Sequence, residues 1–118
     1  MDQNSNCLLV FCTCPDDIAA GRLAERLVER KLAACVNILP AVKSVFYWQG
    51  KLENEQETLL LIKTIAARFG ALRDWLTEAH PYDNPEIIAL DVVAGAKPYL
   101  DWVTSACNDA SPGESPDA

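Results

Sequence analysis

The sequence is poor in basic residues and in histidine. Its 118 residues include 10 lysines and arginines against 17 aspartates and glutamates, with one histidine, and the formal net charge is -7. Binding to nucleic-acid phosphates needs an excess of lysine and arginine, so the charge argues against a nucleic-acid partner. An acidic surface favours solubility and equally the attraction of cations. A cysteine-nucleophile enzyme needs a histidine and an orienting group beside the thiol, so the single histidine weighs against an enzyme.

Several motifs and segments are also missing. The sequence has no glycine-rich phosphate loop, no paired CxxC, no GxSxG and no internal repeat. No apolar run reaches the length of a membrane span, so we expect no membrane partner. The polar start Met1–Asn6 lacks the cationic and apolar regions of a signal peptide. With five cysteines, an odd count, this predicts reduced thiols in a cytoplasmic protein.

What is present indicates one folded domain. Hydrophobic residues make up 50% of the chain and charged residues 23%, which is enough apolar side chain to form a core in a chain of this size. We assign residues 1–107 to this domain. Residues 108–118 are mostly Asp, Ser, Pro, Gly and Glu, and we expect a disordered acidic tail there.

The central stretch Ala33–Thr64 reads as a long β-hairpin. Two β-prone arms flank the polar turn Gln49–Lys51, and Pro40 interrupts the first arm, which predicts a bulge or an edge strand there. Arms of about twelve residues at about 3.3 Å each reach about 40 Å, more than a small chain covers alone. Phe46–Trp48 add aromatic side chains of the kind that pack in interfaces, so the hairpin predicts an obligate oligomer.

The remaining segments alternate between strand and helix patterns. We expect strands at Cys7–Thr13 and Ile87–Val93, a helix capped by Asp16 or Asp17 that ends near Lys31, a second helix through Arg68–Leu76 that ends at His80-Pro81, and a short helix at Lys97–Val103. Ile18, Leu23, Leu27 and Val28 would form the apolar face of the first helix. The order is that of an α+β, ferredoxin-like βαββαβ fold with a short C-terminal helix and an antiparallel sheet in the order 4-1-3-2.

This topology predicts which chemically active side chains meet. The end of the first strand, the end of the second helix and the start of the fourth strand share one edge of the sheet. We therefore expect Cys12, Cys14, His80 and Tyr82 at that edge, near the hairpin tip. Cys35 would lie at the opposite edge.

Five segments also carry a family resemblance. They are Leu32–Asn37, Tyr47–Glu53, Leu61–Thr64, His80–Ile88 and Tyr99–Trp102. Together they resemble the CutA family of divalent-cation tolerance proteins, and the resemblance extends over nearly everything from Cys7 to Val103. It implies a ferredoxin-like protomer in a tight homotrimer held by pairing of the long strands. It also implies a cytoplasmic role in tolerance of divalent cations, copper above all, with no established catalytic activity.

The resemblance places a copper site on Cys12 and His80. Thiolate and imidazole ligands select copper or zinc over magnesium or calcium. Ala79 stands where some members carry a second histidine, which leaves Cys14, on the same strand face as Cys12, or Asp83 to complete the ligand shell. Asp91 is a second departure, since relatives often have proline there.

Each of these residues also has a structural interpretation. Cys12 is the type of small side chain that fills cores, His80 is placed to cap the last carbonyls of a helix, and Cys35 can serve as a ligand, a redox thiol or packing. Two other functions fit a trimer of this kind. One is a small-molecule sensor like the PII signalling proteins, with ligands between subunits, and the other is a structural scaffold that binds partner proteins.

Overall fold

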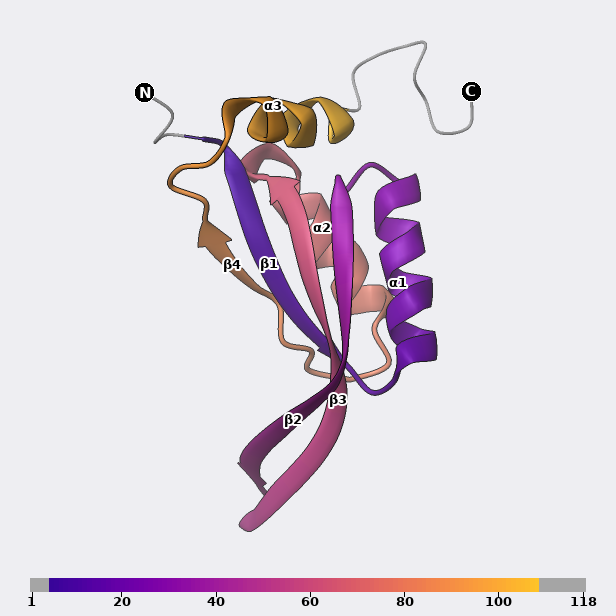
Figure 1. Cartoon of the computed structure of the whole chain (residues 1–118). Helices are drawn as coiled ribbons and strands as arrows, with labels where there is room; N and C mark the ends of the chain where they lie inside the picture. Colours follow the sequence, from indigo (N-terminus) through magenta and orange to yellow (C-terminus); the bar gives the residue numbers. More distant parts are fainter. Residues whose placement is uncertain (1–4, 109–118) are drawn as a thin grey trace.

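A computed structural model describes residues 5–108 of the chain (Figure 1). The elements are β1 (Cys7–Cys14), α1 (Asp17–Glu29), β2 (Cys35–Trp48), β3 (Lys51–Ile65), α2 (Ala66–Ala79), β4 (Ile88–Asp91) and α3 (Lys97–Ala106). The predicted disordered tail, apart from Asn108, lies outside the described residues. Among residues 5–108, no helix combines the length and apolar character needed to cross a bilayer.

The strands form one antiparallel sheet in the order β2-β3-β1-β4. This is the predicted order 4-1-3-2 read from the other edge, so the α+β prediction is confirmed. β4 is shorter than predicted because only four of its residues pair with β1, from Ile88 to Asp91. The predicted C-terminal helix is present as α3, with proline in its first turn.

Both long helices cover the same face of the sheet (Figure 1). The core between them and the strands contains, from the sheet, Val10, Cys12, Cys14, Leu60 and Ile62 and, from the helices, Ala20, Leu23, Ala24, Leu27, Leu72 and Leu76. α1 is capped by Asp16, whose carboxylate accepts a hydrogen bond from the Ala19 N–H at 2.8 Å, so of the two predicted cap residues the structure uses Asp16.

The predicted apolar face of α1 is wrong at its two ends. Ile18 is 72% exposed and Val28 is 43% exposed, while Ala20 and Ala24 are buried beside Leu23 and Leu27. Positions 20, 23, 24 and 27 follow the i, i+3, i+4, i+7 spacing of a helix. Small alanines therefore let α1 approach the sheet closely, and the larger Ile18 is rotated out to solvent.

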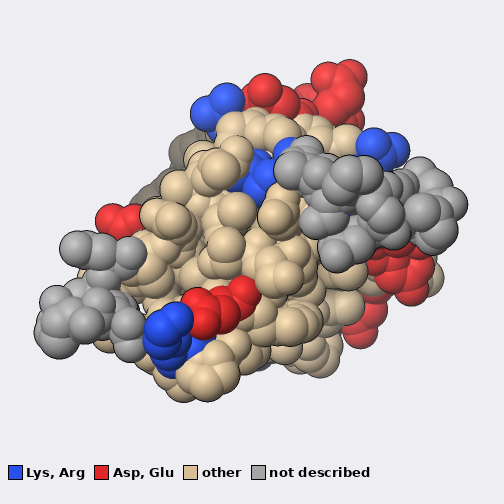
Figure 2. Space-filling model, turned by 90° about the horizontal axis from the view of Figure 1, so that it is seen from above, with Lys and Arg blue, Asp and Glu red and all other residues tan. Residues whose placement is uncertain are grey.

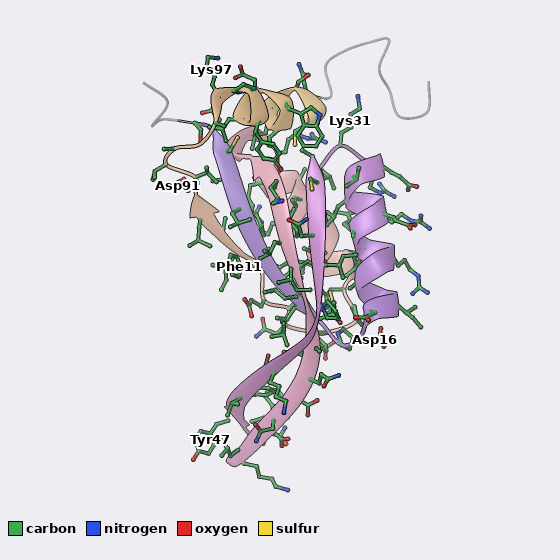
Figure 3. The ribbon with its side chains drawn as sticks, viewed as in Figure 1. Phe11, Asp16, Lys31, Tyr47, Asp91 and Lys97 are labelled. Carbon is green, nitrogen blue, oxygen red and sulfur yellow. The ribbon has the colours of Figure 1, made fainter. Side chains whose placement is uncertain are left out.

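The opposite face of the sheet is not covered by α1 or α2. Residues paired directly across antiparallel strands point to the same side, and Val10 lies on the helix side, so its neighbours Leu9 and Phe11 lie on the other. We call this the open face. Its side chains are Leu9, Phe11, Leu39, Leu59, Leu61, Ile88 and Leu90, together with Cys35, Asn37 and Lys63. Figure 3 shows Phe11 on β1, in front of the helices.

The β2-β3 hairpin extends beyond the body of the domain (Figure 1). Its arms are 14 and 15 residues long, and its turn places Gln49 at φ 51 and Gly50 at φ 81, the positive angles that tight hairpin turns require. The ladder shifts register between Leu39 and Val42, so that Pro40 and Ala41 form a bulge on an edge strand, as predicted. Near the tip Tyr47 is 74% exposed and Trp48 61% exposed, and Figure 3 shows Tyr47 at that end.

Candidate metal centre

Two cysteines and the histidine meet below the end of β1. The Cys12 sulfur, the Cys14 sulfur and a ring nitrogen of His80 all lie within 4.8 Å of one another. All three residues are buried. We call these residues the thiol–imidazole cluster. Among the described residues, it is the only group of three or more His, Cys, Asp or Glu side chains close enough to hold one ion.

Local structure explains why the three side chains converge. Cys12 and Cys14 are two residues apart on a strand and therefore point to the same face. α2 ends at His80, whose N–H still bonds to Leu76 O at 2.9 Å but whose backbone is extended (φ -70, ψ 142). Pro81 follows and excludes helical geometry for His80. The chain therefore leaves the helix at His80.

The structure brings together the two predicted ligands and one of the two residues proposed to complete them. Cys14 belongs to the cluster, whereas Asp83 is exposed and outside it. Cys35 lies at the other end of the sheet, paired with Lys63. The expected closeness to the hairpin tip is wrong, because Cys14 pairs with Thr58 while the tip is at Lys51, about 23 Å farther along an extended strand.

Both ring nitrogens of His80 already have hydrogen-bond partners. Nε2 lies 2.9 Å from the carbonyl oxygen of Thr13, which can only accept, so Nε2 carries the proton. Nδ1 accepts the backbone N–H of Tyr82 at 3.0 Å. In this arrangement neither ring nitrogen offers an unused lone pair to a metal ion.

Tyr82 extends this set of contacts to the hairpin. Its hydroxyl donates to the Glu57 carboxylate at 2.7 Å, and its ring lies 4.9 Å from that of His80. Burial and this carboxylate raise the pKa of the Tyr82 hydroxyl, which keeps its proton. Glu57, Tyr82 and His80 therefore link β3 to the loop after α2.

The hydrogen bond between the two thiols shifts their pKa values in opposite directions. The pKa of Cys14 is lowered to about 6, chiefly because the Cys12 thiol donates a hydrogen bond to its sulfur, with His80 adding to the effect and burial opposing it. The pKa of Cys12 is raised, first by that same hydrogen bond, then by burial and by the negative charges of Cys14, Glu86 and Glu57. Cys14 is thus the thiolate of the pair.

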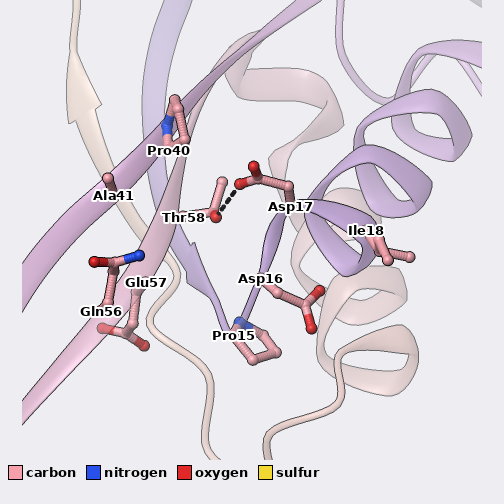
Figure 4. A pocket seen from close by; sticks show the side chains of 9 residues that line it. All are labelled: Pro15, Asp16, Asp17, Ile18, Pro40, Ala41, Gln56, Glu57 and Thr58. Atoms are coloured by element: carbon pink, nitrogen blue, oxygen red, sulfur yellow. Dashed lines mark hydrogen bonds between the residues drawn. The ribbon is translucent and has the colours of Figure 1, made fainter.

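An acidic pocket lies between the start of α1 and the bulge of the β2-β3 hairpin (Figure 4). Its volume is about 460 Å³, and it is lined by Pro15, Asp16, Asp17, Ile18, Pro40, Ala41, Gln56, Glu57 and Thr58. Thr58 donates a hydrogen bond to Asp17 at 2.6 Å, and Thr58 is also the partner of Cys14 on β3. Sequence reasoning missed this pocket because the bulge and the register, which no motif signals, bring Glu57 opposite Asp16 and Asp17.

The donor set suits a soft or borderline metal ion. Two sulfurs and an imidazole favour copper or zinc, whereas magnesium and calcium take oxygen ligands. With a metal–sulfur bond of about 2.3 Å, two sulfurs on one ion lie at most about 4.6 Å apart. The ligand atoms of the cluster fall within 4.8 Å of one another, so small side-chain movements suffice to hold one ion.

Basic side chains do not gather into one patch on the face that Figure 2 shows. Figure 2 shows one face of the molecule, on which blue lysine and arginine side chains lie apart from one another among tan residues, with red acidic side chains between them. The ion pair between Lys97 and Asp101, at 2.8 Å, is exposed and joins neighbouring turns of α3. Pairs of this kind contribute little to stability.

Comparison with known proteins places this geometry in a family. The model of the CutA1 divalent ion tolerance protein matches residues 8–106. The chain is 47% identical to "Protein CutA homolog" of Xenopus laevis over 93 residues, which cover 79% of this chain and 62% of that protein. It is 44% identical to "Divalent-cation tolerance protein CutA" of Pectobacterium atrosepticum, over 84% of this chain and 90% of that protein.

Solved structures agree with the sequence comparison. The crystal structure of CutA from Xylella fastidiosa has a TM-score of 0.86 at 43% identity, covering 88% of this chain and 100% of that one. The divalent cation tolerance protein from Thermus thermophilus has a TM-score of 0.82 at 42% identity, covering 85% of this chain and 97% of that one. The chain belongs to the CutA1 family of divalent-cation tolerance proteins.

Proposed function

We propose that this protein contributes to metal tolerance by binding divalent copper-like cations through Cys12 and His80, with Cys14 as the third ligand. The observation that carries the proposal is the buried thiol–imidazole cluster, in which side chains from β1 and from the end of α2 meet within 4.8 Å. A divalent ion favours about four ligands. The imidazole joins them only when His80 exchanges its hydrogen bond to Thr13 or Tyr82 for the metal.

The acidic pocket supports uptake of cations. Asp16, Asp17 and Glu57 line it, and a cleft lined by one sign of charge raises the local concentration of opposite charge. Its wall continues through Thr58 to Cys14. The Thr58 side chain, which is 2% exposed and hydrogen-bonded to Asp17, stands between the pocket and the cluster, so a cation that reaches Cys14 from the pocket must displace it.

We further propose that the protein acts as a homotrimer, without catalytic activity. The support is the apolar open face, where Ile88 is 53% and Leu90 is 48% exposed, and the hairpin with its exposed aromatic tip. A single chain leaves both surfaces in water, and contact with further copies would bury them.

We propose a cytoplasmic location, because all five cysteines are free, as in a reducing compartment. A relative from Archaeoglobus fulgidus is described as periplasmic, with 39% identity and a TM-score of 0.83. Cell fractionation decides between the two: recovery of the protein with periplasmic markers would contradict the proposal.

A small-molecule sensor is the second candidate, favoured by the pocket of about 460 Å³. Its three carboxylates select a cationic ligand over a phosphate-bearing one. Dialysis against nucleotides and against polyamines separates these classes, since nucleotide binding would contradict the assignment of the pocket to cations.

Divalent binding is tested by zinc titration in competition with a chelator of known strength, using pre-reduced protein without oxygen. Cys12→Ser and His80→Ala are compared with wild type, and Cys35→Ser is the matched control because Cys35 lies at the far end of the sheet. We expect both cluster variants to lose more than about tenfold in affinity and Cys35→Ser to bind as wild type. Equal affinity in all four proteins would remove the site.

A further inference from the structure

The cluster presents two ligands that are ready to bind and one that is not. His80 uses Nδ1 to accept the Tyr82 N–H and Nε2 to donate to the Thr13 carbonyl, at 3.0 Å and 2.9 Å. Cys12 and Cys14 make no comparable contact with the backbone, apart from a long contact of 3.9 Å from the Cys12 sulfur to Thr13 O. A metal ion can therefore bind the two sulfurs without breaking the hydrogen bonds of His80 to Thr13 and Tyr82.

The two sulfurs are placed for an ion with few ligands. Both lie on the helix-covered face of β1, both side chains are 0% exposed, and their sulfurs are within 4.8 Å of each other. Two metal–sulfur bonds of about 2.3 Å allow sulfurs up to about 4.6 Å apart on one ion, so this spacing is compatible with both sulfurs binding the same ion. The surrounding core, which includes Leu60 and Leu76, excludes water as a further ligand.

We propose that Cys12 and Cys14 bind monovalent copper as a two-coordinate dithiolate, with His80 outside the coordination sphere. This proposal rests on the proposed function, metal binding at the thiol–imidazole cluster, and adds to its divalent mode a second mode for monovalent copper in which His80 is not a ligand. Soft thiolates select Cu(I), which accepts two ligands, whereas zinc and Cu(II) need more than this site offers without rearrangement. The ion enters already reduced, any remaining S–H proton leaves to solvent, and no electron is transferred.

His80 then acts as a positioning residue. Its Nε2–H holds the carbonyl of Thr13, the residue between the two cysteines, and its Nδ1 is held by the chain at Tyr82. These two bonds fix the strand segment that sets the separation of the sulfurs. Loss of the imidazole loosens this spacing without removing a ligand, as expected for a group that supports metal ligands from outside.

The test measures Cu(I) affinity of the pre-reduced full-length protein without oxygen, by competition with bicinchoninate. Cys12→Ser and Cys14→Ser should each lose more than about 100-fold, while His80→Gln should lose no more than the about 10- to 100-fold typical of a supporting group. Cys35→Ser, the matched control at the far end of the sheet, should bind as wild type. Wild-type affinity in Cys14→Ser, or a loss in His80→Gln as large as in Cys14→Ser, would overturn the proposal.

X-ray absorption of the Cu(I)-loaded wild type gives a readout that requires no variant. Two sulfur neighbours and no nitrogen neighbour are expected, and a nitrogen at bonding distance would rule out the two-coordinate site. The zinc titration described above separates this proposal from the proposed function. If zinc binding depends on Cys12 and His80, the proposed divalent function is supported. If Cu(I) affinity is at the same time unchanged in Cys14→Ser, the two-coordinate dithiolate is wrong.

Discussion

At the scale of single residues, two features define the cluster. One is the hydrogen bond between the Cys12 and Cys14 thiols, and the other is the pair of hydrogen bonds that His80 makes to the backbone. Cys12 keeps its proton and stabilises the Cys14 thiolate, which lowers the pKa of Cys14 to about 6. His80 uses both ring nitrogens on backbone groups. The same three side chains therefore contribute to stability and form the proposed metal site, and the two effects can be measured separately.

The thiol pair predicts how the stability of the metal-free protein depends on pH. The folded-state pKa of Cys14 lies below its ordinary value of 9.0, so its contribution is present above pH 9 and is lost as pH falls from 9 toward 6. The raised pKa of Cys12 acts oppositely, and its contribution is lost as pH rises above 9. Denaturation midpoints at pH 6, 7.5 and 9, with chelator and at one chain concentration, should rise with pH.

The matched protein for this measurement is Cys14→Ser, which lacks the thiolate. We expect the difference in midpoint between wild type and Cys14→Ser to grow from pH 6 to pH 9. Parallel curves for the two proteins would contradict the lowered pKa of Cys14.

Removal of the imidazole should destabilise the fold even without metal. His80→Ala leaves the Thr13 carbonyl and the Tyr82 N–H without their partner, and an unsatisfied buried group costs about 1–3 kcal/mol. Chemical denaturation of the metal-free protein measures this loss. Tyr47→Ala is the matched control, because Tyr47 lies exposed at the hairpin tip and its removal breaks neither of these hydrogen bonds. A His80→Ala midpoint equal to that of wild type would show that the two bonds contribute nothing.

At the scale of elements, the bulge in β2 shapes both the hairpin and the acidic pocket. Pro40 cannot donate to the ladder and Ala41 adopts φ 62, a left-handed angle that costs a residue with a Cβ about 1–2 kcal/mol. The bulge changes the direction of the hairpin and lines the pocket opposite Asp16 and Asp17. The strained residue Ala41 is therefore also one of the residues that shape the pocket.

Replacement of this alanine by glycine should stabilise the protein. Ala41→Gly relieves the strain of the left-handed backbone angle, but glycine loses more conformational entropy on folding than alanine does. We therefore expect the free energy of unfolding to rise by up to about 1 kcal/mol. Ala71→Gly is the control, since Ala71 is exposed in the interior of α2, where glycine costs about 1 kcal/mol. Thermal denaturation compares the two. Destabilisation of equal size in both variants would contradict the strain argument.

At the scale of the whole molecule, apolar surface remains on the side of the sheet that α1 and α2 leave open. The open face and the hairpin together expose Phe46, Tyr47, Trp48, Ile88 and Leu90. Large apolar side chains exposed in groups are typical of interaction sites. The proposed homotrimer would bury it between copies of the same chain.

Light scattering of the purified protein should therefore give the mass of three chains. Leu90→Asp, at a side chain that is 48% exposed on the open face, should reduce this mass because a charge would be buried in the interface. Val28→Asp is the matched control, since Val28 is 43% exposed on the outer side of α1. A wild-type mass of one chain, or an unchanged mass in Leu90→Asp, would contradict the proposed assembly.

Local pattern was enough for much of this protein. Alternation, caps and proline positions predicted the order of the elements, the cap in the Asp16–Asp17 pair and the bulge at Pro40, because each depends on neighbours in sequence. The antiparallel sheet then followed from that order through the rules of strand connection. The approach of Cys12 to His80 followed from the resemblance and from the topology. These features are determined by the sequence alone.

Tertiary structure decided the rest. It selected Cys14 over Asp83 as the third member of the cluster, left Ile18 in solvent, and brought Glu57 opposite Asp16 across the bulge. It also placed both ring nitrogens of His80 in hydrogen bonds with backbone groups. Each of these outcomes depends on register, helix rotation and hydrogen-bond direction between segments far apart in the chain, and local sequence carries no record of them.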